Sequence, residues 1–369
     1  MPTPAYPVSG RPSARRAART RSGAVALASA LLLAGCASAP EDEPAAGGDT
    51  APDYCARMVT NSGGLEDRSF NQSSWAGLEQ AQEELGIEAE VLVSTSEADL
   101  GPNVTQAVET GCDFVLTVGF ELATATEEAA ADNPDVHFAI VDEVVTAENV
   151  KPIVFDTAQA SYLAGYLAAG VSKTGKVATF GGGNQPPVTL FMDGFVDGVA
   201  KYNEVHGTAV QALGWDKVAQ DGTFTGDFED VSKGKTTTEN LIDQGADVIL
   251  PVAGQVGEGA AAAVLESGSA SLIWVDNDGY ETLPEEYRPI VLTSVLKNTG
   301  DAVVSIVSDD VDGTFDSEPF VGTLENGGVD IAEFHDLAGS VPAELSAEID
   351  GLRDDIIAGE ITVESPSTP

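Results

Sequence analysis

The loop after the first expected strand carries side chains suited to binding a small molecule. Within residues 58–75, a β-branched run ends at Thr60 and two glycines turn the chain. A helix is expected to begin next, with Ser69 and Gln72 in capping-box spacing. In α/β sheets, ligands bind outside the carboxyl ends of the strands. The loop between Thr60 and this helix is therefore a candidate binding site.

Two polar side chains and one aromatic ring stand out in this loop. Asn61 and Asp67 supply hydrogen-bonding groups, and backbone amides at the helix start are free to donate. Phe70 lies in the first turn, where a ring is poorly placed for the core. It either contacts a ligand or packs beneath the loop as a hydrophobic staple, and the residues alone leave both open.

The second half of the chain has a similar aromatic residue. Phe228 follows an expected strand and precedes an expected helix, as Phe70 does. Two rings facing each other across a cleft would sandwich a planar base, and such stacking is worth about 1–3 kcal/mol per base. Two unrelated loop aromatics are the alternative. Gly254 and Gly257 would allow the backbone to approach a ligand closely at the opposite wall.

A carboxylate and an ammonium end two further expected strands. Asp276 follows residues 271–275, and Lys297 follows residues 291–296. A carboxylate that accepts from vicinal hydroxyls, beside an ammonium that donates to one of them, suits a ribose. A salt bridge at a hinge, without a ligand, is the alternative.

Enzymatic constellations are weak in this sequence. None of the three histidines lies in a recognisable nucleophile motif. Residues 170–176 nearly spell a P-loop, but Val177 replaces the magnesium-binding hydroxyl residue. Residues 310–319 partly imitate a calcium loop, but Pro319 stands where the bidentate glutamate is needed. We therefore expect no catalytic residue, no cofactor and no metal.

The N-terminus reads as a processing signal. Five arginines precede an apolar run over residues 24–34, which is too short to span a bilayer. The run ends in residues 33–36, Leu-Ala-Gly-Cys, which look like a bacterial lipobox. Cys36 would then be diacylated, and two acyl chains anchor firmly at a membrane. A secretory signal with a chance cysteine is the alternative, and the sequence leaves Sec or Tat export open. Residues 37–52 are expected to form a disordered tether.

The charge excludes several partners. The chain has 60 acidic and 17 basic residues, a net charge of −43. Such a surface repels nucleic acid and anionic lipid headgroups, and it disfavours anionic ligands in the absence of a basic cluster. Neutral or cationic ligands fit better.

The two remaining cysteines begin neighbouring strands. Cys55 begins the first expected strand and Cys112 the third, and in a sheet of order 2-1-3 these strands are parallel neighbours. A disulfide is plausible in an exported protein, and two buried free thiols are the alternative.

Strand-like and helix-like runs alternate throughout, which predicts an α/β fold with parallel sheets. A chain of this length favours two domains. We expect two doubly wound lobes joined by a hinge with three crossings. The expected boundaries are 53–155 plus about 277–315 for the N-terminal lobe, and 156–276 plus about 316–369 for the C-terminal lobe.

Several of these segments resemble one family. Residues 58–75 are similar to the signature of the basic membrane protein family, the PnrA-like lipoproteins that bind purine nucleosides for ABC transporters. Similar blocks follow at residues 118–120, 134–142, 161–168 and 191–199, and again at 226–235, 241–251 and 274–278. The signature departs from the family at Asn61, where a base-contacting aspartate is expected, and at Glu66.

The resemblance implies a type I periplasmic-binding-protein clamshell with its ligand in the cleft. It implies a lipid-anchored, extracytoplasmic binding protein that delivers guanosine, inosine or adenosine to ABC permease subunits. Asn71, within the signature, joins the expected ligand-binding set, and a monomer is expected. Rival interpretations are a binding protein for another neutral solute such as a sugar, a ligand-sensing lipoprotein, and a nucleoside hydrolase or phosphorylase.

Overall fold

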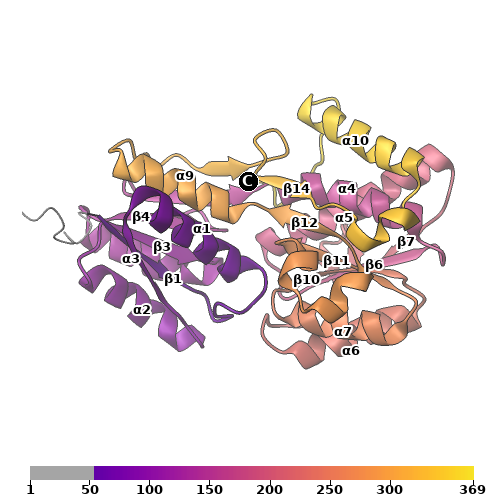
Figure 1. The fold of residues 1–369 in the computed structure, drawn as a ribbon, viewed down its shortest axis with the longest axis horizontal. Coiled ribbons are helices and arrows are strands. Elements are labelled where there is room, and N and C mark those ends of the chain that lie inside the picture. The colour runs from indigo at the N-terminus through magenta and orange to yellow at the C-terminus, as the bar shows by residue number, and fades with distance from the viewer. Residues whose placement is uncertain (1–53) are drawn as a thin grey trace, which may run out of the picture. The chain divides into compact units, whose positions relative to one another are not determined.

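Two six-stranded sheets organise residues 54–369, the part of the chain that the computed structural model describes (Figure 1). The expected α/β fold with two parallel-sheet lobes is confirmed. The expected signal segment, the lipidation site at Cys36 and the tether lie outside the described residues. Within residues 54–369, no helix is both long enough and apolar enough to cross a bilayer.

The first sheet has the strand order β13-β5-β4-β3-β1-β2, and all its neighbouring strands are parallel. Its strands are β1 (Cys55–Val59), β2 (Glu88–Leu92), β3 (Phe114–Val118), β4 (His137–Val141), β5 (Val150–Phe155) and β13 (Phe320–Gly322). The helices of this lobe are α1 (Phe70–Leu85), α2 (Glu97–Glu109), α3 (Ala123–Asp132) and α9 (Thr299–Val311), with a 3₁₀ turn η1 (Phe120–Leu122).

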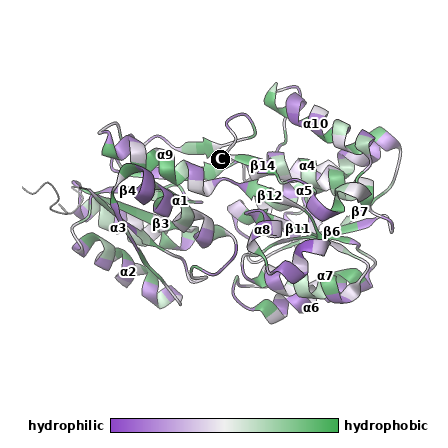
Figure 2. Cartoon of the chain, in the orientation of Figure 1, coloured by the Kyte–Doolittle hydropathy of each residue, from purple (hydrophilic) through white to green (hydrophobic). Residues whose placement is uncertain are grey.

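Alternation along each strand gives this sheet two apolar faces. Ala56 and Met58 of β1 pack in one cluster with α1 and α9, whereas Val59 packs in another with α2 and α3. Successive side chains of a strand point to opposite faces, so a parallel strand covered on both sides is apolar along its whole length. Figure 2 shows this contrast between hydrophobic strands and helices of mixed character.

The second sheet has the order β14-β12-β11-β10-β6-β7, parallel except for the pair β12–β14. Its strands are β6 (Lys176–Gly181), β7 (Gln211–Leu213), β10 (Val248–Val252), β11 (Ser271–Asp276), β12 (Val291–Lys297) and β14 (Val329–Ile331), and β8 (Trp215–Asp216) pairs separately with β9 (Asp221–Gly222). Its helices are α4 (Thr157–Val171), α5 (Pro186–His206), α6 (Val231–Asp243), α7 (Val256–Ser267), α8 (Gly279–Thr282), α10 (Ala343–Ile357), η2 (Glu285–Ile290) and η3 (His335–Ser340).

Three crossings join the sheets, and two of them differ from the sequence-based boundaries. The first follows β5, as expected at Asp156. β12 pairs with β11 in the second sheet, so the chain returns to the first lobe only after Lys297 and not near residue 277. It then stays there through β13, which pairs with β5, and leaves after Gly322 and not near residue 315. These corrections arise because strand pairing, which sequence periodicity does not report, assigns each strand to a sheet.

A close contact between α1 and α9 positions the chain just after the second crossing. A Cβ on Gly77 of α1 would lie 2.4 Å from the carbonyl oxygen of Gly300 in α9. The two backbones therefore touch where any side chain would hold them apart. Because α9 begins two residues after Lys297, this contact brings Lys297 beside the start of α1.

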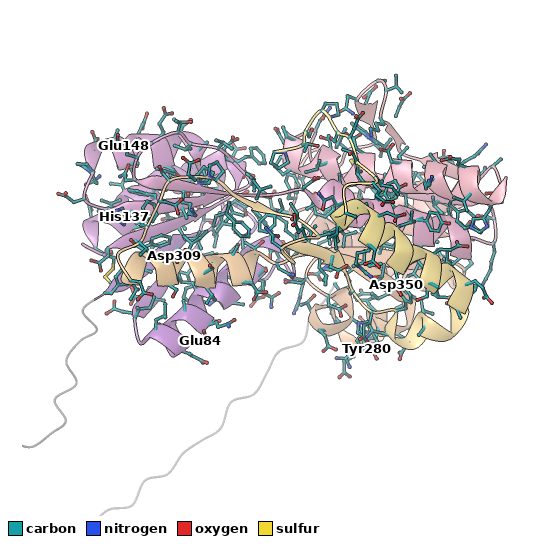
Figure 3. All side chains as sticks on the ribbon, turned by 90° about the horizontal axis from the view of Figure 1, so that it is seen from above. Glu84, His137, Glu148, Tyr280, Asp309 and Asp350 are labelled. Carbon is teal, nitrogen blue, oxygen red and sulfur yellow. A yellow bond between two sulfur atoms is a disulfide. The ribbon has the colours of Figure 1, made fainter. Side chains whose placement is uncertain are left out.

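Acidic side chains are spread over the surface of both lobes. Figure 3 labels exposed examples from α1, from the loop before β5, from α9 and from α10: Glu84, Glu148, Asp309 and Asp350. The strong negative charge is therefore carried by solvated groups, where it is tolerated.

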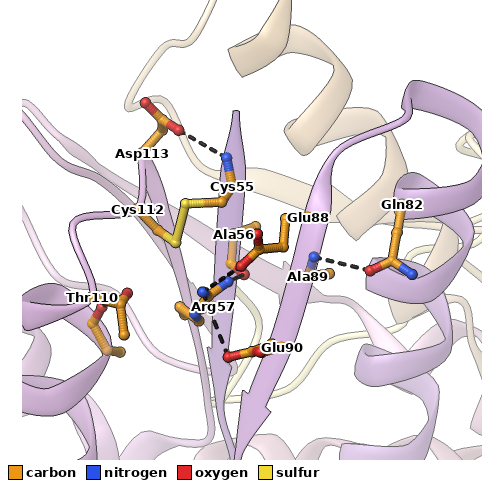
Figure 4. The surroundings of a disulfide bond; sticks show 11 residues. Cys55, Ala56, Arg57, Gln82, Glu88, Ala89, Glu90, Thr110, Cys112 and Asp113 are labelled. Atoms are coloured by element: carbon orange, nitrogen blue, oxygen red, sulfur yellow. Dashed lines mark hydrogen bonds and ion pairs between the residues drawn. A yellow bond between two sulfur atoms is a disulfide. The ribbon is translucent and has the colours of Figure 1, made fainter. Parts of the chain in front are cut away.

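A disulfide joins Cys55 and Cys112 at the amino ends of β1 and β3, with their Cα atoms 4.9 Å apart (Figure 4). Beside it, Arg57 donates to Glu88 at 2.7 Å and lies 3.5 Å from Glu90. The disulfide closes a loop that contains β2 and α2, so it restricts the unfolded chain over much of the first lobe.

Loss of this disulfide is expected to lower the free energy of unfolding by about 4 kcal/mol in the chain-entropy model. Chemical unfolding of the Cys55→Ala/Cys112→Ala variant and of the unchanged protein measures the difference. After reduction of its disulfide, the unchanged protein should be as unstable as the variant. Peptide mapping without reductant should recover the linked pair. Two freely alkylatable thiols in natively exported protein would contradict it.

Candidate functional site

One pocket gathers residues that follow the carboxyl ends of strands in both sheets. Seven of the eight sequence-predicted ligand residues line it: Asn61, Asp67, Phe70, Phe228, Gly254, Asp276 and Lys297. Asp276 and Lys297 end β11 and β12, Phe70 begins α1, and the others lie in the loops after β1 and β10 and before α6. Because parallel strands present their carboxyl ends at one edge, loops far apart in sequence converge there.

Asp67, and not a capping box, holds the start of α1. Its carboxylate accepts from the backbone N–H groups of Ser69 at 3.1 Å, Asn71 at 2.7 Å and Gln72 at 3.1 Å. The expected Ser69–Gln72 capping box is wrong, because Ser69 donates its hydroxyl to Asp276. Burial raises the pKa of Asp67 to about 6, although these N–H groups favour the charged form.

Asn71 stands behind the pocket and positions Asn61. Its Nδ2 donates to Asn61 Oδ1 at 2.7 Å and to Asp67 Oδ2 at 3.0 Å. The N–H of Gly63 donates to the same Asn61 oxygen at 3.0 Å. Asn71 does not line the pocket. Asn71 thus holds the Asn61 amide in one orientation, and a direct contact of Asn71 with a ligand stays a prediction.

Phe228 lies against a strip of glycine backbone. A Cβ on Gly182 would lie 2.3 Å from Phe228 Cε1, and one on Gly254 would lie 3.8 Å from Phe228 Cβ. Asp227 fixes the turn by accepting from the N–H groups of Glu229 and Asp230. With one side on bare backbone, the ring is held so that it borders the pocket.

Phe228→Ala should weaken the binding of every planar ligand of this pocket by a similar factor, roughly five- to hundred-fold, because stacking tolerates different bases. Titration calorimetry with several planar ligands measures it. Phe315→Ala is the aromatic control, since Phe315 stacks on His137 and does not line the pocket. A loss confined to one ligand would argue against stacking.

Lys297 is a buried cation between aromatic rings and carboxylates. Its side chain is 3% exposed and forms an ion pair with Asp142. Its Nζ lies 4.6 Å from the ring centre of Phe70 and 5.3 Å from that of Phe155. The Lys297 ammonium also interacts electrostatically with the carboxylate of Asp276. The expected pairing of Lys297 with Asp276 is thus shared with Asp142, which sequence reasoning did not include in the site.

Asp276 and Asp142 have unusual backbones at their strand ends. Their φ angles are +65° and +64°, in the left-handed region that non-glycine residues rarely adopt. Such strain persists where the surroundings demand it, and it gathers at functional sites. Burial raises the pKa of Asp276, whereas Lys297 and the Ser69 hydroxyl lower it.

Glu121 is a second pocket residue that sequence reasoning missed. It lies in η1, three residues after β3 ends. Its Oε2 is buried and has no hydrogen-bond partner within residues 54–369. Burial, together with the charges of Glu229, Asp142 and Glu97, raises the pKa of Glu121 to about 7. The signal that could have found Glu121 and Asp142 is their position just after buried strands.

The backbone amides in the P-loop-like turn at residues 170–176 are hydrogen-bonded within the protein. Asp247 accepts from the N–H groups of Lys173 at 2.6 Å and Thr174 at 2.9 Å, and from the hydroxyl of Ser172. Those amides are therefore already used by a carboxylate and are not left for a phosphate.

The stretch that imitates a calcium loop is also engaged elsewhere. Asp310 is buried, and it accepts from the hydroxyl of Tyr54 and bonds the ring of His137. Among the described residues, no group of three or more His, Cys, Asp or Glu side chains is arranged to hold a metal ion.

Comparison with known proteins assigns the family. Residues 56–366 match the family described as "ABC transporter substrate-binding protein PnrA-like". The chain is 32% identical over 93% of its length to the "ABC transporter nucleoside-binding protein BmpA" of Lactococcus lactis subsp. cremoris, covering 97% of that protein. It is 28% identical over 82% of its length to "Basic membrane protein A1" of Borrelia garinii subsp. bavariensis, covering 86% of it.

A solved structure supports the same assignment. An ABC transporter system solute-binding protein from Aeropyrum pernix K1 superposes with a TM-score of 0.74 at 26% identity, covering 84% of this chain and 92% of that one. The sequence match spans both sheets and nearly all the described residues. The chain belongs to the PnrA-like family of ABC transporter substrate-binding proteins.

Proposed function

We propose that this protein binds a purine nucleoside in the pocket between its two sheets and delivers it to an ABC permease without chemical change. The observation that carries the proposal is that Phe70 and Phe228, from separate lobes, both line one pocket. Aromatic rings from two sides suit a planar base. The relative from Lactococcus lactis, described as nucleoside-binding, supports the same ligand class.

The hydroxyl-binding end of the pocket is assigned to Asp276 and Lys297. Asp276 accepts a hydrogen bond from the Ser69 hydroxyl and has acceptor capacity left for a ligand hydroxyl, while Lys297 supplies a donor. Buried groups of this kind favour ligands that complete their hydrogen bonds. A ribose presents vicinal hydroxyls that match them.

The charge of the pocket favours a neutral ligand. Among the described residues that line it, Lys297 is the one lysine or arginine, against the carboxyl groups of Asp67, Glu121, Asp142 and Asp276. A phosphate would meet an excess of negative charge in a poorly solvated place. Nucleosides therefore suit this site better than nucleotides.

Delivery at a membrane completes the proposal. We propose that Cys36 is lipidated and anchors the protein on the extracytoplasmic face. Fractionation of a Cys36→Ser variant tests this, since it should move to soluble fractions. Unchanged membrane retention would refute the anchor.

Native mass spectrometry of freshly purified protein tests the ligand class. A bound mass equal to a purine nucleoside is expected, and calorimetry with inosine, guanosine and adenosine should then give binding. Incubation with inosine should release no free base, because a binding protein leaves its ligand intact. A sugar as the bound species, or release of hypoxanthine, would overturn the proposal.

A further inference from the structure

Asn61 and Glu121 lie together on one wall of the pocket, on either side of Gly119. A Cβ on Gly119 would lie 2.6 Å from Glu121 Oε2 and 3.3 Å from Asn61 Nδ2. Gly119 also has a φ of +113°, which side chains other than that of glycine rarely allow. Glycine at this position therefore leaves room for the two polar groups to approach each other.

These two groups have complementary free hydrogen-bonding capacity. Asn61 Oδ1 already accepts from Asn71 and from the N–H of Gly63, so its orientation is fixed and its Nδ2 is left to donate. Glu121 Oε2 is buried and accepts from no residue in the described part of the chain. A donor and an acceptor thus stand side by side on the wall, each needing a partner.

We propose that Asn61 and Glu121 together read the O6 and N1–H edge of a 6-oxopurine nucleoside, and that Glu121 thereby determines specificity. The inference rests on the proposed nucleoside function and deepens it. In guanine and hypoxanthine, O6 accepts and N1–H donates, which matches an amide donor beside a carboxylate acceptor. Adenine has the reverse arrangement, an amino donor beside a nitrogen acceptor, and would set donor against donor.

Guanosine offers one contact more than inosine. Its N2 amino group lies beside N1–H, and a carboxylate can accept from two adjacent donors with its two oxygens. Guanosine should therefore bind at least as tightly as inosine.

The groups around Glu121 are acidic and disfavour its ionised carboxylate. Glu97 faces it from α2, Asp142 from the end of β4, and Glu229 from the loop before α6. All three are acidic, and with burial they raise the pKa of Glu121 to about 7. A ligand N–H donor would satisfy the ionised carboxylate that these surroundings otherwise disfavour.

The test compares three nucleosides on three proteins by titration calorimetry. The unchanged protein should bind inosine and guanosine roughly tenfold or more tightly than adenosine. Glu121→Gln should weaken both 6-oxopurine nucleosides by roughly tenfold and should not weaken adenosine, because the glutamine amide can donate to adenine N1. Glu97→Gln is the matched control: it removes a neighbouring exposed carboxylate that does not line the pocket, and it should keep the preference.

A pH series on the unchanged protein gives an independent readout. Inosine affinity should fall as the pH is lowered through about 7, where the Glu121 carboxylate protonates, and Glu121→Gln should remove this part of the pH dependence.

Three results would overturn the inference. They are adenosine binding as tightly as inosine, Glu121→Gln weakening all three nucleosides equally, and an unchanged pH dependence in Glu121→Gln. Nucleoside binding without this discrimination would defeat the inference alone, whereas no nucleoside binding at all would defeat the proposed function with it.

Discussion

Replacement of Lys297 by methionine is expected to lower the free energy of unfolding by about 3–5 kcal/mol. The ammonium is buried and pairs with Asp142, which is itself only 12% exposed in its side chain. Methionine fills a similar volume but leaves that carboxylate in a poorly solvated place without its cation. The penalty comes from the unpaired charge and not from lost packing.

Urea unfolding at neutral pH measures this effect. A second variant, Lys297→Met/Asp142→Asn, should recover part of the loss, because it removes one of the two carboxylates that interact with Lys297 and leaves Asp276 without the cation. Lys235→Met is the control, since Lys235 pairs with Glu266 at the surface and its loss should change little. A midpoint unchanged in Lys297→Met would contradict the interpretation, and so would a double variant no more stable than the single one.

Replacement of Asp276 by alanine is expected to abolish the preference for ribosides, with a loss of roughly ten- to hundred-fold for inosine. A site built to bond a hydroxyl penalises a ligand that lacks it, and removal of the acceptor removes that penalty. A dideoxy analogue should therefore bind the variant about as well as inosine does. Calorimetry on both ligands measures the ratio. If the ratio is intact in Asp276→Ala, Asp276 serves the hinge and not the ribose.

The Asp276→Asn variant measures how the buried carboxylate affects the free energy of unfolding. Burial raises the pKa of Asp276 above its ordinary value of 3.8, so the folded state binds this proton more tightly than the unfolded state. The contribution of this group to stability is therefore full below about pH 4 and is lost as the pH rises through the folded pKa. The asparagine variant should equal the unchanged protein in stability at acidic pH and exceed it at neutral pH. A variant less stable at neutral pH would show that the carboxylate stabilises the fold.

The sequence predicted the fold well because its signal is local. Predominantly apolar strands such as β3 alternate with helices, and this pattern alone indicates parallel sheets covered on both faces. It also predicted most of the pocket, because polar and aromatic residues that follow strands must lie at one edge of a sheet. Asn61, Phe70, Phe228, Asp276 and Lys297 were all found by this rule.

The boundaries and the partners were harder to predict. The sequence of β12 does not indicate that this strand pairs with β11 and not with a strand of the first sheet. Likewise, the spacing of Ser69 and Gln72 indicated a cap, but the hydroxyl of Ser69 is taken by Asp276, 207 residues away. Asp67, two residues before Ser69, does the capping.

The sequence by itself determined the α/β class, the family and the set of strand-end residues available to a ligand, since these depend on periodicity and on motifs within short segments. Only the tertiary structure decided which of them act together. It placed Asn71 where it orients Asn61, paired Lys297 with Asp142, and left Glu121 Oε2 without a hydrogen-bond partner among residues 54–369. The physical reason is that hydrogen bonds, ion pairs and desolvation act over a few ångströms. Distances on that scale between residues far apart in sequence are established only when the sheets and helices pack.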